Sequence, residues 1–479
     1  MIYSFFFFLL LFVVIGVSSI FYSRHSRQDY YLASHSVPSW LVGLSAVATN
    51  NSGYMFIGVI GYTYVTGLAA IWLMVGWIAG DFLASMFIHK RLRQAAIDTD
   101  EASYAGVLGH WGGVRFKTFQ RLASILSLVF LLSYAAAQLV AGGKALQVLF
   151  GWPNWGGAVM GSALVVMYCF AGGIRASIWT DAAQSFVMIL AMGLLLVTAT
   201  VSLGGVDQSI ADMHRIEGFM DWFPRDLAVP GLSGGVLFAL SWMFAGLSVI
   251  GQPHVMVRFM ALKGKNSMIS ARAWYYGWYI LFYAMATGVG LLSRIYLPDS
   301  VNFDAELALP TMARQLLPPA LVGLILAGMF AATMSTADSL VLSCSASITH
   351  DLLPHKIEKT WLLKAATIGI TSMALLWALL NRQSVFSLVI MAWSTLASAF
   401  APLLIVLALG GRPAQRLYIW MLLVGTGTAL AWRWFGLHNA VYEGMPGILA
   451  GLLVFGISAG IKKTLNKEDL TEAESPVTE

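Results

Sequence analysis

Apolar runs of about 20 residues recur along this chain, and short polar segments separate them. A run of that length spans the hydrocarbon core of a bilayer as an α-helix, whereas a membrane barrel shows shorter segments of alternating polarity. We count thirteen such runs, which begin near residues 2, 38, 66, 120, 155, 178, 231, 273, 318, 362, 385, 414 and 441. The pattern predicts an all-α integral membrane protein with about thirteen spanning helices.

Composition supports this class. Hydrophobic residues make up 58% of the 479 positions and charged residues only 11%, whereas a soluble domain carries roughly 25% charged residues. The first run lacks a basic leader and a small-residue cleavage site, so we expect a retained helix. Cys169 and Cys344 lie far apart in apolar runs and are expected to be buried small residues. The motifs contain no plausible catalytic set, so we do not expect an enzyme.

Basic residues predict the orientation in the membrane. With the N-terminus outside, 21 of the 28 Lys and Arg residues fall in inside loops, Arg258 among them. Lys and Arg concentrate in cytoplasmic loops, so the predicted orientation is N-terminus outside and C-terminus inside. The polar residues 462–479 are expected to form a disordered cytoplasmic tail.

Polar residues interrupt three of the runs. The segment 331–349 places eight hydroxyl side chains and Asp338 inside one run. Such groups are costly in hydrocarbon, so they normally face a protein interior or a water-filled path. Hydroxyl oxygens without a competing positive charge suit a weakly held sodium ion, which favours a transporter over a membrane anchor.

The other two interruptions lie five runs apart. The run that begins near 38 carries the polar block 49–53, and the run that begins near 231 contains Gly246, Ser248, Gly251 and Pro253. Paired broken helices in two halves of a chain indicate an inverted-repeat transporter with its binding site near the midplane. At a break, freed carbonyls coordinate a cation and helix N-termini hold a carboxylate. The alternative is that Gly and Ser only allow close helix packing.

Four segments resemble the sodium/solute symporter family, and most closely its bacterial sodium/proline symporters. They are DYYLASHSVPSWLVGLSAVATNNSGYMFIG (29–58), FAGGIRASIWTDAAQSFVMI (170–189), GQPHVMVRFMA (251–261) and LILAGMFAATMSTADSLVLSCSASITHDLL (324–353). The likeness covers nearly the whole chain, and GQPH-x-x-x-RFMA and the MST cluster are its specific motifs. The resemblance implies one transporter domain with a LeuT-like core of two inverted five-helix repeats, at 38–203 and 231–410. It also implies an extra N-terminal helix within 1–37, extra C-terminal helices within 411–461 and a tail at 462–479.

The resemblance also implies two sites. Its sodium site would use the carbonyls of Ala48, Asn51 and Ala332 and the hydroxyls of Ser335 and Thr336. Its substrate site would lie around Asn50, Ser52, Gly53, Tyr134, Ala245, Ser248, Val249 and Trp393. The chain departs from the proline symporters at Asn50, where they have an acid, and at Ala245 and Val249, where they have aromatic residues. The substrate therefore stays open between an amino acid such as proline or a related carboxylate, and a sugar or polyol.

Three acids lie within predicted spans: Asp81, Asp181 and Asp338. A carboxylate in the membrane is a functional candidate by default. Asp181 matches the WTD motif of the family, in which some relatives use this carboxylate for a second sodium ion. We hypothesise that Asp181 and Asp338, with Ser339, form a second cation site for sodium or a proton and compensate for the acid missing at position 50.

The alternative for these acids is a structural hydrogen bond, for example between Asp181 and Arg175 at the inner surface. His254 of the GQPH motif is expected to make a helix-end hydrogen bond at the inner end of its span, in preference to relaying protons.

The predicted function is a sodium-coupled symporter of the bacterial inner membrane that imports a small polar organic solute by alternating access. Its expected partners are sodium, the solute and the bilayer, without nucleic acid, an obligatory protein partner or a cofactor other than the coupling ion. A transporter-like solute sensor is the alternative from another class. Such sensors usually carry an appended signalling domain, and the sequence shows none.

Overall fold

The computed structural model of this chain describes residues 1–473 except 23, 25, 228, 265–266, 299–301, 354–356, 358 and 381–383. In this part of the chain all regular structure is helical, and one isolated bridge joins Val37 to Leu262. The long helices are α1 (Ile2–Ser18), α5 (Ile71–Thr99), α7 (Lys117–Phe150), α8 (Asn154–Gly172), α9 (Ile174–Ser202), α11 (Leu232–Leu247), α13 (Met268–Tyr296), α15 (Pro319–Ala346), α16 (Thr360–Leu380), α17 (Val385–Ala408), α18 (Gln415–Trp434) and α19 (Gly444–Ala473). The shorter helices include α2 (Arg27–Leu32), α3 (Ser39–Asn50), α4 (Ile60–Thr66), α6 (Tyr104–Gly109), α10 (Val206–His214), α12 (Pro253–Met260) and α14 (Ala308–Leu316).

The all-α membrane architecture is confirmed, and each of the thirteen predicted runs lies on a helix or a pair of helices. Among the described residues, eleven helical segments are long and apolar enough to cross a membrane. The count is lower because the runs that begin near 38 and 66 contribute one joined segment, Tyr54–Thr99, and because α18 is not included. The count of thirteen and the repeat boundaries stay predictions.

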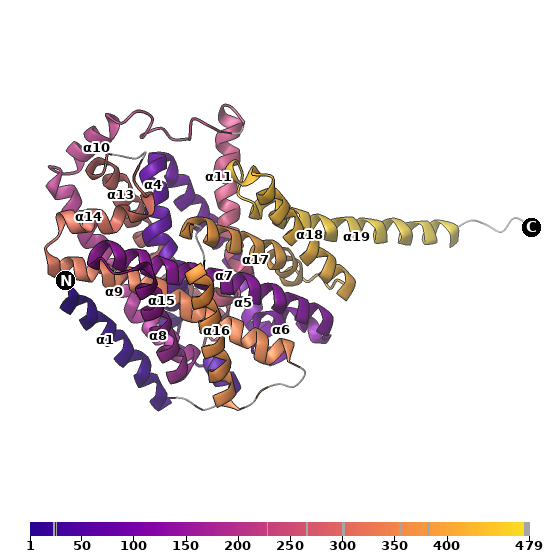
Figure 1. Ribbon diagram of the computed structural model, residues 1–479. Coiled ribbons are helices and arrows are strands. Elements are labelled where there is room, and N and C mark those ends of the chain that lie inside the picture. Colours follow the sequence, from indigo (N-terminus) through magenta and orange to yellow (C-terminus); the bar gives the residue numbers. More distant parts are fainter. Residues whose placement is uncertain are drawn as a thin grey trace, which may run out of the picture.

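The helices differ sharply in how far the bundle buries them. In α15 and α17, 89% of the most apolar stretch is buried, against 28% in the segment of α1 and 22% in α19. Figure 1 shows α1 along the edge of the bundle, where it packs on α8, α9 and α15. The hydroxyl-rich α15 is therefore a central helix, and its polar side chains face protein and not lipid.

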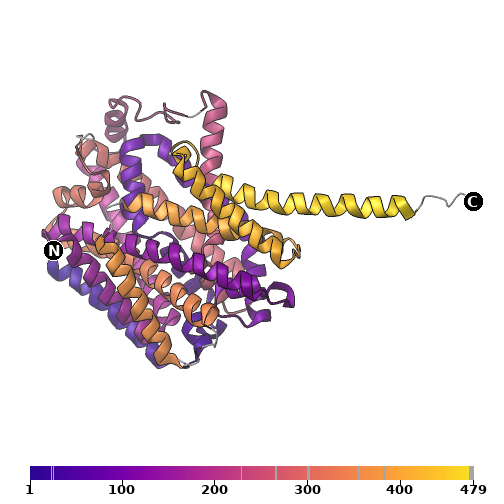
Figure 2. The same cartoon turned by 45° about the vertical axis from the view of Figure 1, so that its right-hand side comes forward.

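The C-terminal helix extends beyond the bundle. Figures 1 and 2 show α19 projecting away from the other helices in both views. It continues to Ala473, so the disorder predicted from residue 462 is wrong up to that residue. A helix that starts in an apolar span can continue through polar residues because charged side chains such as Lys and Glu have high helix propensity. The remaining tail, 474–479, lies outside the described residues.

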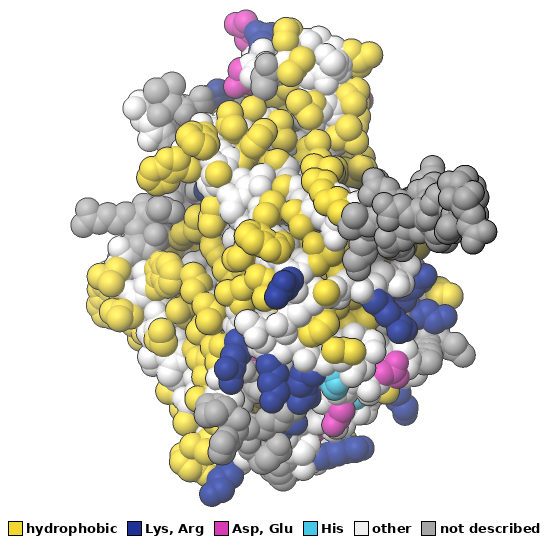
Figure 3. Space-filling model, turned by 90° about the vertical axis from the view of Figure 1, so that its right-hand side faces the viewer, with side chains coloured by type: hydrophobic (Ala, Val, Ile, Leu, Met, Phe, Trp, Pro, Cys, Tyr) yellow, Lys and Arg dark blue, Asp and Glu magenta, His cyan; other side chains and the backbone are white. Residues whose placement is uncertain are grey.

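The two ends of the bundle differ in charge. On the face shown in Figure 3 an apolar band crosses the middle of the molecule, and Lys and Arg side chains gather below it. The short helix α10 lies at the opposite end in Figure 1. This separation is the one that membrane insertion produces, with basic residues on the cytoplasmic side.

Candidate functional site

Both predicted breaks are present. Helix α3 ends at Asn50, Asn51 leaves the helical region with φ −88° and ψ 60°, and a π-helical turn (Tyr54–Val59) leads into α4. Asn and Ser side chains hydrogen-bond to nearby backbone and so compete with the helix. Helix α11 passes through a 3₁₀ turn (Ser248–Gly251) to Gln252, which is extended, and α12 begins at Pro253. Proline cannot continue a helical ladder, so the chain must break before it.

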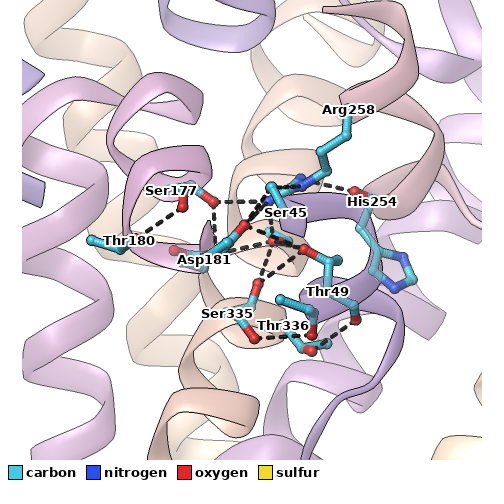
Figure 4. Close-up of polar contacts among 12 residues, drawn as sticks. Ser45, Thr49, Ser177, Thr180, Asp181, His254, Arg258, Ser335 and Thr336 are labelled. Carbon is cyan, nitrogen blue, oxygen red and sulfur yellow. Dashed lines mark hydrogen bonds and ion pairs between the residues drawn. The ribbon is translucent and has the colours of Figure 1, made fainter. Parts of the chain in front are cut away.

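The hydroxyl groups of α15 contact the broken end of α3. The Ser335 hydroxyl donates to the carbonyls of Ala48 and Ala332, at 3.1 Å each. The Thr336 hydroxyl donates to the carbonyl of Thr49 at 2.9 Å. Figure 4 shows these contacts beside the charged side chains described below. The structure thus brings together four of the five predicted sodium ligands.

The fifth predicted ligand, Asn51, lies at the break itself. Its side-chain amide donates to the carbonyl of Val47 at 3.0 Å, which holds the residue against the end of α3. Its carbonyl as a ligand stays a prediction. Because hydroxyls and carbonyls are neutral oxygens, the group can replace part of the water shell of a hard cation without holding it tightly.

A buried charge cluster lies next to these hydroxyls. The Arg258 guanidinium of α12 lies 3.4 Å from the Asp181 carboxylate of α9 and 4.0 Å from the Asp338 carboxylate of α15. It also donates to Ser177 at 2.7 Å and to Ser339. All five side chains are essentially inaccessible to solvent. Figure 4 shows Arg258 reaching across to Asp181 from its own helix.

Further hydroxyls join the charge cluster to the end of α3. The Ser45 hydroxyl donates to Asp181 at 2.6 Å, and the Thr49 hydroxyl lies 3.2 Å from that of Ser339. Ser339 donates to the carbonyl of Ser335, and also to Asp338 at 3.0 Å. The predicted second cation site is therefore contiguous with the predicted sodium site.

The cluster contains more negative than positive charge. Asp181 and Asp338 share one guanidinium, and one oxygen of each carboxylate has no hydrogen-bond partner among the described residues. An uncompensated buried charge is strongly unfavourable. Chemically, the cluster can accept one further cation, either a metal ion or a proton.

Three predictions about charged residues are wrong. Arg258 is not an inner-loop residue but a core residue of the charge cluster. Arg175 pairs with Asp29 at 2.5 Å and not with Asp181. His254 lies at the break and not at the inner end, because α12 begins at Pro253. Its ring packs edge-on against Tyr134 and Trp393, and none of the described residues forms a hydrogen bond with either ring nitrogen.

The predicted substrate residues gather around the two breaks. The Tyr134 hydroxyl of α7 donates to Ser52 at 3.0 Å. The Trp393 indole of α17 donates to the carbonyl of Ala245 at 3.2 Å, and the two rings are 6.4 Å apart. Gly53 donates its amide to Gln138 at 2.9 Å.

Three other predicted substrate residues occupy the edge of this region. The Ser248 hydroxyl accepts from Tyr442 at 3.0 Å, and Val249 is fully buried in the turn next to it. The amide of Asn50 points away from Tyr134 and donates to Tyr275 of α13 at 2.5 Å. The side chain of Asn50 therefore faces α13.

The structure adds residues that the sequence prediction missed. Trp77 of α5 packs at a tilt between Tyr54 and Trp393, with ring centroids 5.6 and 5.5 Å away. Four polar groups are buried without hydrogen-bond partners among the described residues: the Trp77 indole nitrogen, the Tyr54 hydroxyl, the Gln138 amide nitrogen and the Gln252 side-chain carbonyl oxygen. Gln252 could have been found from the GQPH motif and Gln138 from its place one turn after Tyr134. Trp77 has no comparable signal, because 17 tryptophans occur in the chain.

A cavity of about 910 Å³ opens near this region. Lys144 crosses its wall and pairs with Asp304 at 3.0 Å and Glu306 at 2.6 Å. Phe386 also lines the cavity and stacks on Tyr54, which lies on Trp77 in turn. Aromatic rings therefore separate the cavity from the two breaks.

Comparisons with known proteins identify relatives of this chain. The model of the sodium:solute symporter family matches residues 30–412. The chain is 31% identical to a sodium/proline symporter of Haemophilus influenzae, with 93% of this chain and 92% of the relative covered. It is 28% identical to the sodium/proline symporter of Escherichia coli, with 95% and 92% covered.

Among solved structures, the chain resembles a Na⁺-coupled sialic acid symporter in a substrate-bound outward-open state. The TM-score is 0.79 at 18% identity, with 96% of this chain and 97% of that chain covered. A nucleobase-cation-symport-1 family transporter in a closed conformation gives a TM-score of 0.58 at 16% identity. At these identities the likeness concerns the fold.

Proposed function

Because this chain belongs to the sodium:solute symporter family, we propose that it couples sodium entry to the uptake of a small polar organic solute by alternating access. The observation that carries this proposal is the contact of Ser335 and Thr336 with the broken end of α3. A sodium ion bound there would join two helices that belong to different halves of the core. Joining them favours one arrangement of the two halves, which is how a bound ion shifts a conformational equilibrium.

Coupling follows from this shared arrangement. If sodium and solute each favour the doubly occupied form, each raises the affinity of the other by the same factor, typically equivalent to about 1–3 kcal/mol. The solute would bind between Tyr134, Trp393 and the two breaks, next to the sodium ligands of α3. No cofactor besides the coupling ion is proposed.

We propose an amino acid such as proline, or a related carboxylate, as the solute. The relatives named above are proline symporters, and unpartnered donors at Trp77 and Gln138 suit carboxylate oxygens. The Trp393 indole reaches the backbone carbonyl of Ala245, where the small side chain replaces the aromatic residue of the proline symporters. A solute of different shape from proline is compatible with that change, and a sugar or polyol is the competing class.

The second proposed cation site consists of Asp181, Asp338 and Ser339. Its support is the buried excess of negative charge beside the sodium ligands. A second sodium ion or a proton would neutralise that excess, so the cluster is compatible with transport of two sodium ions or of one sodium ion and one proton per solute.

We propose that the protein lies in a bacterial inner membrane with its N-terminus outside and its C-terminus in the cytoplasm. With Arg258 removed from the inner loops, 20 of 28 basic residues remain on the predicted inner side. The cavity lined by Lys144 also includes Asp304, Ala305 and Glu306, which follow the predicted span that begins near 273 and lie outside in the predicted orientation. A solute entering from outside would reach the breaks through this cavity.

Thermal unfolding of the purified protein with amino acids, carboxylates and sugars, in sodium and in potassium chloride, tests the proposal. A solute that stabilises only in sodium supports symport and names the substrate class. Ser335→Ala should weaken the apparent sodium affinity about tenfold or more, because it removes a proposed oxygen ligand, and loss of even a supporting partner of a metal ligand typically costs about 10–100-fold in metal affinity. Ser343→Ala on the same helix is the matched control, because its hydroxyl has no hydrogen-bond partner among the described residues. Equal stabilisation in both salts would refute sodium coupling.

Uptake into proteoliposomes separates a transporter from a solute sensor. Solute that binds in the thermal assay but does not accumulate under a sodium gradient would favour the sensor. Accumulation that collapses when the gradient is dissipated supports the symporter.

A further inference from the structure

Asp81 is a buried acid that the proposed transport sites do not use. It lies in the middle of α5, and none of its side chain is accessible. The preceding residue, Gly80, lets α11 approach so closely that a Cβ there would lie 1.9 Å from the carbonyl of Met243. This packing excludes water and lipid from the α11 side of the carboxyl. An acid in such a place needs a specific partner or a function.

The contacts of Asp81 leave its charge uncompensated. The Tyr275 hydroxyl donates to one carboxyl oxygen at 2.7 Å, and the other oxygen has no partner among the described residues. Tyr276 and Tyr279 of α13 also face this carboxyl, and phenols carry no positive charge at neutral pH. In the described part of the chain, no ion pair includes Asp81, and α11 carries no ionisable side chain.

The other ionisable groups near α5 interact with residues other than Asp81. The positive charge of Arg272 interacts with Tyr276 and with His89, which lies two turns along α5 from Asp81. Of the residues on α12, Arg258 is engaged by the charge cluster and His254 lies against Tyr134 and Trp393. A cation of the protein itself therefore does not balance Asp81. A proton does so with the fewest requirements, because it binds to a single carboxyl oxygen, whereas a sodium ion needs several oxygen ligands at once.

A hydrogen-bonded chain joins Asp81 to the end of α3. The Tyr275 oxygen that donates to Asp81 also accepts from the amide of Asn50 at 2.5 Å. Two predicted sodium ligands lie next to Asn50 in the sequence: Ala48, two residues before it, and Asn51, directly after it. The side-chain carbonyl oxygen of Asn50 is buried and has no hydrogen-bond partner in the described part of the chain.

The direction of the hydrogen bonds between Asn50, Tyr275 and Asp81 depends on whether the Asp81 carboxyl carries a proton. With Asp81 ionised, Tyr275 donates to the carboxylate and accepts from the Asn50 amide, as observed. If the proton binds the carboxyl oxygen that faces Tyr275, the acid donates to the Tyr275 oxygen, and the phenol proton needs a new acceptor. The Asn50 carbonyl oxygen becomes that acceptor if the amide turns over. The proton state of Asp81 thus sets the orientation of a side chain next to the sodium ligands.

We propose that Asp81 is a proton-binding site that is linked through Tyr275 and Asn50 to the sodium site at the end of α3, so that proton and sodium binding oppose each other. This inference rests on the proposed sodium site. The opposing sign follows because the ionised carboxylate favours a nearby cation and supports the observed Asn50 orientation. The proton moves only between bulk solvent and one carboxyl oxygen, and no other covalent bond changes.

Proton release on sodium binding tests the inference. Purified protein in weakly buffered detergent solution at pH 6.5 receives sodium or potassium chloride, and a pH dye reports released protons. The wild type should release protons only with sodium, and its apparent sodium affinity from thermal unfolding should fall about fivefold from pH 8 to pH 6, within the usual range for coupled sites. Asp81→Asn should lose at least half of the release, and the remainder reports Asp181 and Asp338.

A second variant keeps the test decisive if Asp81→Asn does not fold. Tyr275→Phe retains the Asp81 carboxyl but removes the hydrogen bonds that join it to Asn50. This variant should also lose at least half of the sodium-induced proton release. Tyr283→Phe is the matched control, because this buried hydroxyl of the same helix has no hydrogen-bond partner within the residues that the structure describes. Release as large as wild type in both Asp81→Asn and Tyr275→Phe would overturn the inference, as would a wild type that sodium stabilises without releasing protons. If sodium stabilises none of these proteins, the proposed sodium site fails and this inference with it.

Discussion

Arg258 is the only cation in the charge cluster among the described residues, and its removal tests how the cluster is balanced. The perturbation is a double-mutant cycle of Arg258→Gln, Asp338→Asn and both together. The formal charge of the cluster is −1 in the wild type, −2 in Arg258→Gln, 0 in Asp338→Asn and −1 again in the double variant. Charge balance therefore predicts that the two substitutions compensate each other.

The distances set the expected magnitude. With an effective dielectric constant of about 20, the separations of 3.4 and 4.0 Å correspond to attractions of about 5 and about 4 kcal/mol. Desolvation offsets much of this, and loss of one partner from a buried pair costs about 3–5 kcal/mol. We expect Arg258→Gln to lose about that much stability, and Asp338→Asn to change it by about 1 kcal/mol or less, because Asp181 keeps its partner.

The stability of the double variant decides whether the two substitutions compensate each other. It leaves a single carboxylate, so it should be about 2 kcal/mol more stable than the sum of the two single effects, within the usual range for contacting residues. The free energy of unfolding is measured by reversible SDS titration in mixed micelles. Effects that add to within about 0.5 kcal/mol would refute the reasoning, since independent sites behave in that way.

Two further predictions concern stability away from the cation sites. At Asp29, burial raises the pKa of the carboxyl, but hydrogen bonds from the Arg24 amide and from Arg175 outweigh it and leave that pKa below its usual value. This stabilisation is present above about pH 4 and is lost as the pH falls through the lowered value. Asp29→Asn, about 2 kcal/mol less stable at pH 7, should therefore converge with wild type on acid titration, and a constant difference would contradict this. Gly80→Ala should cost about 1–3 kcal/mol through its clash with a carbonyl of α11. Gly277→Ala, a helical glycine with open space around it, is the control and should not destabilise.

The sequence predicts the helices well because bilayer thickness imposes a length on every apolar run. The polar block at 49–53 and the glycine-proline interruption of α11 also predict the two breaks, since few residue types disrupt a helix in the membrane. The continuation of α19 could not be predicted in the same way. The polar composition from residue 462 indicates exposure to water. An exposed helix and a disordered segment are both compatible with that composition.

The site is less predictable because its partners come from distant segments. Ser335 and Thr336 stand out as hydroxyls in an apolar run, but Arg258 looks like a basic residue at a helix end. Only the fold shows that it lies between Asp181 and Asp338, 77 and 80 residues away in sequence. Trp77 was missed for a similar reason, since a tryptophan in an apolar run gives no indication of which face it occupies.

The last two turns of α3 connect all of the proposed ion sites. Ser45 binds Asp181, the carbonyls of Ala48 and Thr49 accept from α15, and Asn50 leads through Tyr275 to Asp81. Because the helix breaks directly after Asn50, these turns can tilt without moving α4 by the same amount. An ion that binds to any of these partners therefore acts on the same short piece of backbone. Cooperation or competition among the ions then requires no long pathway, since each site biases the position of one helix end.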